Sequence, residues 1–206
     1  MSISTYTQLK SAIAEWLDRT DLTARIPDFI SFAGTDIQHK VRHWRMEQRD
    51  TATLDSQYSA VPAGFLEAIR VSITSGTTHE LTRVGQSEML EMRAKGANGT
   101  GEPRYYTMTA GEIEVYPTPS GNYTIELVYY GTLDALSDVT TTNWVLTHHP
   151  EAYLYGALSR AEPYLKNDER IGIWKSLYAE AIAAINSDGE KSKYGSTGLR
   201  MKARSF

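Results

Sequence analysis

The sequence predicts an α+β fold in which N-terminal and C-terminal helix pairs form a helical bundle, with a central antiparallel β-sheet block between them along the chain. Two observations carry this prediction. Apolar residues recur at helical spacing near both ends of the chain, whereas the middle alternates apolar and polar residues between turn signals. Strands and helices do not alternate as they do in parallel α/β proteins, so the two kinds of element are expected in separate layers.

The N-terminal helix pair is expected at residues 5–18 and 26–44. Thr5 and Gln8 have the spacing of a capping box, in which each side chain bonds the backbone amide of the other residue. Pro27 suits a first helical turn, because the amide that it lacks would have no intrahelical partner there. The apolar faces consist of Leu9, Ile13, Trp16 and Leu17 in the first helix, and of Phe29, Ile30, Ala33, Ile37, Val41 and Trp44 in the second.

The β block is expected at residues 45–132. Arg45–Leu54 is polar and rich in threonine, which is typical of a strand with a solvated face. Ala68–Thr74 alternates apolar and polar residues, and Leu81–Val84 is expected to pair with it across a glycine-containing turn. Residues 87–95 are expected to form a short helix after these strands. The glycine-rich stretch that follows, at 96–101, is expected to be a mobile loop.

The clearest strand pattern lies after that loop. Arg104–Met108 and Ile113–Tyr116 flank Ala110-Gly111, which predicts a hairpin turn, and a second turn precedes Tyr123–Tyr130. These three strands predict an antiparallel meander. In the last strand one face carries Tyr123, Ile125, Leu127 and Tyr129.

The C-terminal helix pair is expected at residues 150–165 and 168–186. Pro150 suits the first turn of one helix, and Asp168 can cap the other by accepting a backbone hydrogen bond. Because the link between them is short, the two helices should pack as an αα-hairpin. Residues 1–187 are therefore expected to form one domain, followed by an extended C-terminal tail at 188–206.

Composition excludes several classes of function. The absence of cysteine removes disulfides, thiolate catalysis and cysteine-ligated zinc. No apolar run is long enough to cross a bilayer and the N-terminus has no signal pattern, so a cytoplasmic protein with no membrane partner is expected. The net charge is −4, but Asp188–Phe206 carries five basic and two acidic residues, so the rest of the chain carries −7. An acidic body should not adhere to nucleic acid, whereas the tail could.

Few residues have the arrangement that chemistry requires, and no enzyme, cofactor or metal site is predicted. His39 and His43 are four residues apart on an expected helix, which is the spacing of two metal ligands, but a solvated or contact face is the favoured interpretation. Glu112 and Glu114 alternate on an expected strand and are interpreted as a solvated surface rather than an acid and base pair. The glycines at 96, 99 and 101 lack the spacing of a nucleotide loop.

The C-terminal tail is the candidate site. It has too few apolar residues to fold alone, which leaves three interpretations: a frayed terminus, a segment that orders on a partner, or a DNA-binding arm. In the second interpretation, large apolar side chains anchor the segment and cations match an acidic surface. The residues concerned are Lys191, Lys193, Tyr194, Leu199, Arg200, Met201, Lys202, Arg204 and Phe206.

The order of several short motifs resembles tailed-phage head-to-tail adaptor proteins of the podovirus tail-tube and gatekeeper kind. The likeness begins with Tyr6-Thr7-Gln8-Leu9-Lys10, continues through Val61-Pro62-Ala63-Gly64-Phe65-Leu66 and Ile113-Glu114-Val115-Tyr116-Pro117, and ends with Asn143-Trp144-Val145-Leu146 and Tyr164-Leu165-Lys166-Asn167-Asp168. It spans nearly the whole chain. These are structural residues, and it is their order and spacing that carry the resemblance.

The resemblance implies a non-enzymatic virion protein, with residues 1–187 as its adaptor domain. Such proteins form a ring, usually of twelve copies, below the portal protein of the filled head, and they leave a channel through which genomic DNA passes during ejection. A helical bundle surrounds the channel and a β region faces the tail nozzle or tail-fibre protein. The C-terminal segment docks into the portal. Assembly would take place in the host cytoplasm, and the mature location would be the phage neck.

Overall fold

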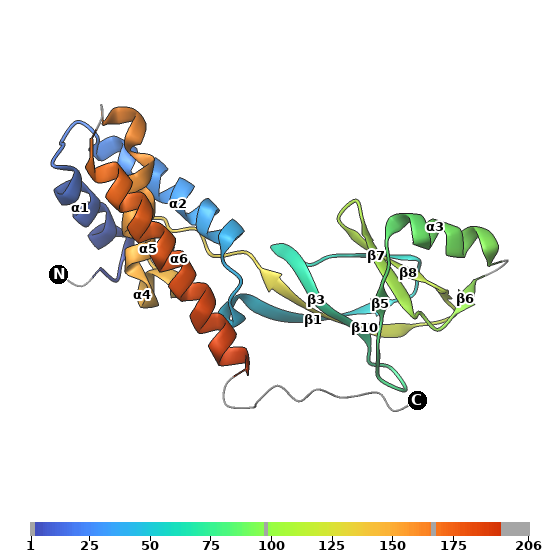
Figure 1. The fold of residues 1–206 in the computed structure, drawn as a ribbon. Helices are drawn as coiled ribbons and strands as arrows, with labels where there is room; N and C mark the ends of the chain where they lie inside the picture. The colour runs from blue at the N-terminus through green and yellow to red at the C-terminus, as the bar shows by residue number, and fades with distance from the viewer. Residues whose placement is uncertain (1–2, 97–98, 166–167, 195–206) are drawn as a thin grey trace. The chain divides into compact units, whose positions relative to one another are not determined.

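The computed structural model describes residues 3–96, 99–165 and 168–194 of the chain. It confirms the α+β class, with helices from the two ends of the chain packed together and antiparallel sheets in the middle. The fold comprises two compact units (Figure 1): a helical unit, Met1–Met46 with Leu133–Phe206, and a β unit, Glu47–Thr132. Among the helices of the described residues, none is both long and apolar enough to span a membrane.

The helical unit contains five α-helices and three short 3₁₀ turns among its described residues. Its N-terminal part holds α1 (Tyr6–Leu17), η1 (Thr23–Arg25), α2 (Ile26–Lys40) and η2 (Trp44–Met46), and its C-terminal part holds α4 (Trp144–His148), α5 (Pro150–Arg160), η3 (Glu162–Tyr164) and α6 (Arg170–Tyr194).

The first helix begins as predicted. The Thr5 side chain accepts the Gln8 backbone amide and the Gln8 side chain accepts the Thr5 amide, which completes the capping box. The prediction for the second helix was wrong at its end: α2 stops at Lys40 rather than residue 44, because Val41 adopts an extended backbone and is fully buried. The segment after Lys40 therefore does not follow helical spacing.

The central helix of this unit is α5, which contacts α1, α2, α4 and α6. The predicted αα-hairpin is present, since α5 packs on α6 across the short η3 connection. Glycine lets the helices approach closely at Gly156, where an added Cβ would lie 3.1 Å from both Ala33 of α2 and the Tyr178 ring of α6. The apolar side chains of α5 are buried on nearly all sides, which fits its place in the middle of the bundle.

A buried neutral network holds the start of α4 on α5. Asn143 caps α4 by accepting the Leu146 amide at 3.0 Å. Its side-chain amide donates to the Asp134 carbonyl and to the Tyr153 hydroxyl, both at 2.8 Å. Burial raises the pKa of Tyr153 to about 12, with the Asn143 bond acting in the opposite direction, so this hydroxyl stays neutral.

The last helix is longer than predicted. Asp168 accepts the Arg170 amide at 3.0 Å, as expected of a residue at a helix start. The helix then runs to Tyr194 instead of ending at residue 186, so residues 188–194 of the predicted extended tail are helical. Apolar residues on one side of α6, including Trp174 and Ile185, remain buried against the bundle and support its full length.

The described part of the β unit contains ten strands and one helix. The strands are β1 (Glu47–Leu54), β2 (Tyr58–Ala60), β3 (Phe65–Ile73), β4 (His79–Glu80), β5 (Thr82–Arg83), β6 (Thr100–Gly101), β7 (Tyr105–Thr109), β8 (Glu112–Tyr116), β9 (Thr118–Pro119) and β10 (Tyr123–Gly131), and the helix is α3 (Gln86–Lys95). Two four-stranded sheets have the orders β1-β10-β3-β4 and β2-β8-β7-β5, and β6 pairs with β9.

The predicted hairpin between β7 and β8 is confirmed, and Ala110 and Gly111 both have positive φ at its turn. The predicted meander was wrong, because β10 does not follow β8 in one sheet but lies between β1 and β3 in the other. The expected pairing of Leu81–Val84 with Ala68–Thr74 is confirmed only at its start, where the Leu81 amide donates to the Val71 carbonyl at 2.8 Å. Thr82 and Arg83 form β5, which pairs in parallel with β7, while β4 pairs with β3.

The core of the β unit lies between its two sheets. The face of β10 that carries Ile125, Leu127 and Tyr129 is buried there, as the alternation predicts, together with Val71 of β3 and Val115 of β8. The predicted mobile loop after α3 was partly wrong, because Thr100 and Gly101 form β6; residues 97 and 98 lie outside the described residues.

Candidate functional site

The predicted docking residues begin at the end of α6. Lys191 and Lys193 are exposed on its last turns, and Tyr194 is its final residue. The other predicted residues, Leu199, Arg200, Met201, Lys202, Arg204 and Phe206, lie outside the described residues. The structure therefore defines the point from which the predicted docking segment departs.

A set of contacts, here called the α6 clasp, ties that point to the chain leaving α2. The Asn186 side chain bonds the backbone in both directions, accepting the Arg42 amide and donating to the Lys40 carbonyl, each at 3.1 Å. At Gly189 an added Cβ would lie 3.0 Å from the His43 ring, so glycine is needed for the helix to pass this closely. The clasp fixes α6 beside residues 40–45.

His43 is the buried centre of the clasp, with only 1% of its surface exposed. Its ring stacks on Trp144 at 4.8 Å and lies 5.5 Å from the Trp44 ring. Nδ1 accepts the Arg45 amide at 3.1 Å, which places the proton of the neutral ring on Nε2, 3.4 Å from the Asp188 carboxylate. Burial lowers the pKa of His43 and outweighs the opposing effect of Asp188.

The two histidines weighed as metal ligands do not share a helical face. His39 is exposed on α2, whereas His43 follows the end of that helix and points into the aromatic pair. Within the described parts of the chain, no three His, Asp or Glu side chains are close enough together to hold a metal ion. Sequence reasoning missed the role of His43 because it assumed that the helix continued.

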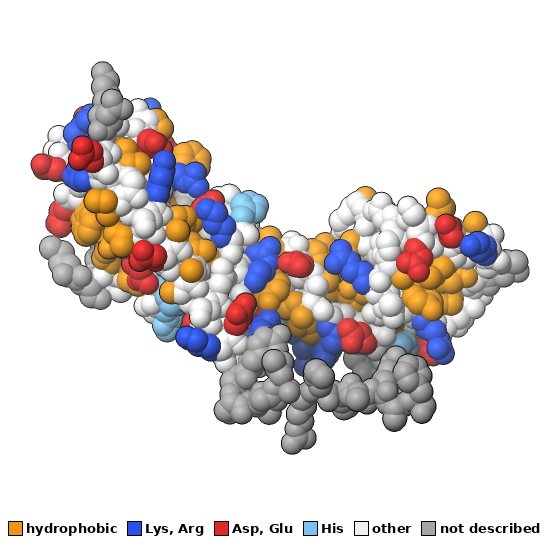
Figure 2. Space-filling model, in the orientation of Figure 1, with side chains coloured by type: hydrophobic (Ala, Val, Ile, Leu, Met, Phe, Trp, Pro, Cys, Tyr) orange, Lys and Arg blue, Asp and Glu red, His pale blue; other side chains and the backbone are white. Residues whose placement is uncertain are grey.

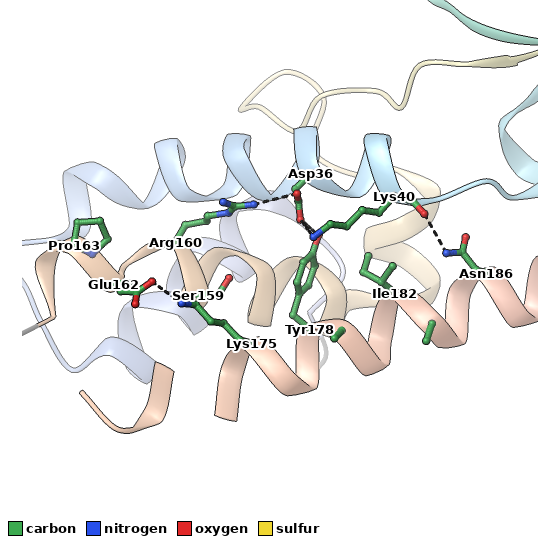
Figure 3. Close-up of a pocket in the computed structure, with 12 residues that line it drawn as sticks. Asp36, Lys40, Ser159, Arg160, Glu162, Pro163, Lys175, Tyr178, Ile182 and Asn186 are labelled. Atoms are coloured by element: carbon green, nitrogen blue, oxygen red, sulfur yellow. Dashed lines mark hydrogen bonds and ion pairs between the residues drawn. The ribbon is translucent and has the colours of Figure 1, made fainter. Parts of the chain in front are cut away.

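A groove of about 750 Å³ runs along the helical unit between α2 and α6, over the end of α5 (Figure 3). Its apolar wall comes from α6, where Ile182 is buried and the small Ala179 and Ala183 are exposed. Asn186 of the α6 clasp lines the same groove. The groove and the clasp therefore form one continuous surface that leads to the end of α6.

Asp36 is the charged centre of this groove. It accepts hydrogen bonds from Lys40 at 2.7 Å and from Tyr178 at 2.8 Å, and Arg160 lies 3.2 Å away. Burial raises the pKa of Asp36, but the bonds from Lys40 and Tyr178 lower it by more, so the carboxylate stays ionised. Burial and the bond to Asp36 raise the pKa of Tyr178. A satisfied carboxylate and a protonated phenol suit a contact surface better than acid and base catalysis.

The solvated interpretation of Glu112 and Glu114 was wrong for one of them. Glu112 is exposed, but Glu114 is buried beneath α3, where it accepts Arg93 Nε at 2.7 Å and the Gln57 side-chain amide at 3.0 Å. Arg93 also donates to the Val115 carbonyl. This carboxylate therefore anchors a helix to a sheet. The strand pattern could not reveal it, because the covering helix lies elsewhere in the sequence.

The glycines after α3 also have a structural role. Gly96 and Gly99 lie against the Tyr116 ring, and a Cβ at either position would overlap it.

Figure 2 shows acidic, basic and apolar side chains mixed on the face that it presents, over both units. No single-sign field of the kind that binds nucleic acid is visible on that face.

Comparison with known proteins supplies the remaining evidence. A family model described as SU10 adaptor protein matches residues 4–201. No curated protein matches the sequence. The family match includes both units and most of the predicted docking segment.

Proposed function

The chain belongs to the SU10 adaptor protein family of phage head-to-tail adaptors, and from this membership we propose that it assembles as a ring, of twelve copies, between the portal and the tail. It is a structural protein of the phage virion, and the family indicates no catalytic role. In this proposal the ring leaves a channel through which genomic DNA passes at ejection. Its partners are the portal protein, neighbouring copies, and a tail nozzle or tail-fibre protein.

The observation that carries the proposal is the family match across 4–201. Charge supports the channel: outside Asp188–Phe206 the chain carries −7, and a negative wall lets DNA slide without adhering. The α6 clasp supports docking by the C-terminal segment. Because Asn186 and Gly189 hold α6 against the bundle, the segment after Tyr194 leaves from a defined place, which reduces the entropy lost on binding.

The test is a truncation that leaves the clasp intact. Deleting residues 195–206 removes Leu199, Met201 and Phe206 but retains the whole of α6. The truncated protein should fold as the full chain does and fail to bind purified portal rings in sedimentation and electron microscopy. Unchanged affinity for the portal would remove the docking role from this segment.

Two sets of substitutions separate the apolar anchors from the charges. Leu199→Ala with Met201→Ala and Phe206→Ala should abolish stable docking, because the anchors supply the buried area. Replacing Arg200, Lys202 and Arg204 by glutamine should mainly slow association and weaken its dependence on salt. A matched control replaces Ser196 and Thr197 by alanine and should bind as the unmodified chain does.

The alternative is a DNA-binding arm formed by the last turns of α6 and the segment that follows, favoured by the five basic residues of Asp188–Phe206. It predicts DNA binding whose affinity falls steeply with salt and is lost when Lys191, Lys193, Arg200, Lys202 and Arg204 are neutralised. A filter-binding or anisotropy measurement with duplex DNA at 50 and 200 mM salt decides between the two. Absence of binding at the lower salt would exclude the arm.

A further inference from the structure

Among the strands at the edges of the sheets, β1 differs from the others in length. Every other strand at an edge of a sheet in the described residues is short: β2 has three residues, and β4, β5, β6 and β9 have two each. Strand β1 also lies at an edge, but it has eight residues, Glu47–Leu54 (Figure 1). Short edge strands are a common protection against pairing with another chain, and β1 lacks it.

Of the other protections, β1 has charged side chains, but Arg49 and Asp50 are bonded to side chains of β10. Its register with β10 is regular from Glu47 to Leu54, whereas the pairing of β10 with β3 is interrupted by two shifts. The strand contains neither proline nor lysine. All six residues from Gln48 to Thr53 are exposed, so no described segment of the β unit covers this edge. A long, straight, uncovered edge is a template for an added strand.

The ladder shows which backbone groups point outward. Thr124 directs its carbonyl to β3, where it accepts the Thr74 amide at 2.8 Å. The backbone amides and carbonyls of alternate residues point to opposite neighbouring strands. Those of Ile125, Leu127 and Tyr129 therefore point to β1. Their partners there are Ala52, Asp50 and Gln48. It follows that Arg49, Thr51 and Thr53 present their amides and carbonyls to the open edge.

Side chains hold this edge in place on both faces of the sheet. On one face Arg49 and Arg70 each lie 2.8 Å from the Glu126 carboxylate, which is 9% exposed. On the other face the Tyr129 hydroxyl donates to Asp50 at 2.8 Å and lies 3.0 Å from Gln48 Oε1. Because both faces anchor β1 to β10, the edge is pre-organised for an incoming strand and little order is lost on binding.

We propose that the open edge of β1 is a docking site for an extended, cation-bearing segment of the tail-side partner, which adds as a fifth strand. Only an extended backbone matches the alternating groups of Arg49, Thr51 and Thr53. The β unit has eleven acidic and six basic residues, a net charge of −5, so a basic segment is favoured and the acidic β1 of a second copy is disfavoured. The identity of the partner rests on the proposed adaptor function.

Proline at Thr51 tests the edge without breaking the native ladder. The Thr51 amide points outward, so Thr51→Pro removes an outward donor and adds a ring to the edge while the bonds from β1 to β10 remain. We expect binding of the tail protein to portal-bound adaptor rings to fall about tenfold or more. Thr51→Val keeps the amide and the branched shape, and should bind as the unmodified protein does. Equal binding by both variants would overturn the proposal.

Two substitutions of opposite charge at one position test whether the partner segment carries cations, and neither removes a backbone amide. Thr53 is exposed and faces Thr124 across the ladder, so no charged residue lies directly opposite either substitution. Thr53→Lys should weaken tail-protein binding and Thr53→Glu should strengthen it, each by about two- to fivefold at low salt. The reverse order, or no difference, would contradict a cation-bearing strand. This comparison decides the question even if Thr51→Pro lowers the stability of the β unit.

Cross-linking identifies what lies on the edge. The chain has no cysteine, so Thr53→Cys offers one attachment site for a short photo-cross-linker in assembled particles. Cross-linked peptides from the tail protein support the proposal, whereas peptides from another adaptor copy or from residues 195–206 overturn it. Portal attachment is measured on the same rings. If the unmodified chain does not attach to the portal, the adaptor function itself is refuted. If it attaches but Thr53→Cys gives no cross-link to the tail protein, only the proposed docking site on β1 is refuted.

Discussion

The helical unit and the β unit bury polar groups in opposite ways. In the helical unit the buried network is neutral: Asn143 joins the Tyr153 hydroxyl to a backbone carbonyl, and His43 is held uncharged between tryptophans. In the β unit the two buried carboxylates are in ion pairs, Glu114 with Arg93 and Glu126 with two arginines. The ionised Asp36 of the helical unit is left partly exposed in the groove, whereas the β unit buries its carboxylates beneath long, partly exposed arginine side chains.

The largest expected effect comes from Leu158→Ala, at the centre of the helical unit. Leu158 is fully buried in α5, so the cavity should cost about 3–5 kcal/mol of the free energy of unfolding. All four tryptophans, at 16, 44, 144 and 174, belong to this unit, so tryptophan fluorescence reports its unfolding alone. Denaturant titration followed by fluorescence measures the loss.

The same variant tests whether residues 1–187 behave as one domain, as the sequence predicts. Backbone amide hydrogen exchange along the same denaturant series reports the opening of the strands in the β unit. One cooperative domain requires both signals to shift together. A strand signal that keeps its original midpoint would contradict the single-domain prediction. Leu127→Ala in β10 is the equivalent core truncation in the β unit, since Leu127 is 4% exposed there.

Arg93→Met should be the most damaging polar change in the β unit. It leaves the Glu114 carboxylate buried with only Gln57 as a hydrogen-bond donor, at a cost of about 3 kcal/mol. Adding Glu114→Gln should recover part of the loss, because the uncompensated charge is removed. Thermal unfolding of the single and double variants measures this coupling. A double variant no more stable than Arg93→Met would show that the charge pair is not the cause.

Asn143→Ala should cost about 2 kcal/mol in the helical unit, because it removes the α4 cap and leaves the Tyr153 hydroxyl and the Asp134 carbonyl without their donor. Tyr153→Phe removes only one arm of the same network and should cost about 1 kcal/mol. Fluorescence-detected titrations compare the two. Equal losses would mean that the cap contributes nothing beyond the hydroxyl.

The smallest effects are the most diagnostic, because the two units should respond to pH with opposite sign. His43 has a pKa lowered from 6.5 by burial, so the folded state binds fewer protons than the unfolded state in the window below 6.5. Its neutral form, facing Asp188, Arg45 and His149, is favoured by folding. Stability of the helical unit should therefore fall as pH drops through 6.5, and His43→Gln should flatten the fluorescence-detected profile.

His79 should act in the reverse direction in the β unit. Its ring nitrogens face the carbonyls of Pro103 at 2.9 Å and Thr77 at 3.1 Å, which accept but cannot donate, and Glu102 lies 3.7 Å away. These bonds raise its pKa above 6.5, outweighing burial and Arg104. Its contribution is present below pH 6.5 and lost as pH rises through the raised pKa. His79→Gln should remove that loss, as measured by amide hydrogen exchange in the strands of the β unit.

Local patterns predicted much of the backbone correctly. The capping box of Thr5 and Gln8, the turn at Ala110-Gly111 and the apolar face of β10 depend on neighbours within a few residues, and each was confirmed. Errors arose where distant segments decide. The burial of Val41 ends α2 early, and the packing of α6 on the bundle extends it to Tyr194. Strand order failed because β10 pairs with segments more than fifty residues away.

The sequence by itself determined the fold class, the helix pairs and the adaptor family, because these follow from periodicity, short-range hydrogen bonds and the order of motifs along the chain. Only the tertiary structure decided that His43 lies buried in the α6 clasp, that Glu114 is buried beneath α3, and that β1 is left as an open edge. The physical reason is that burial and pairing are properties of two surfaces in contact, and a pattern read along one segment describes only one of them.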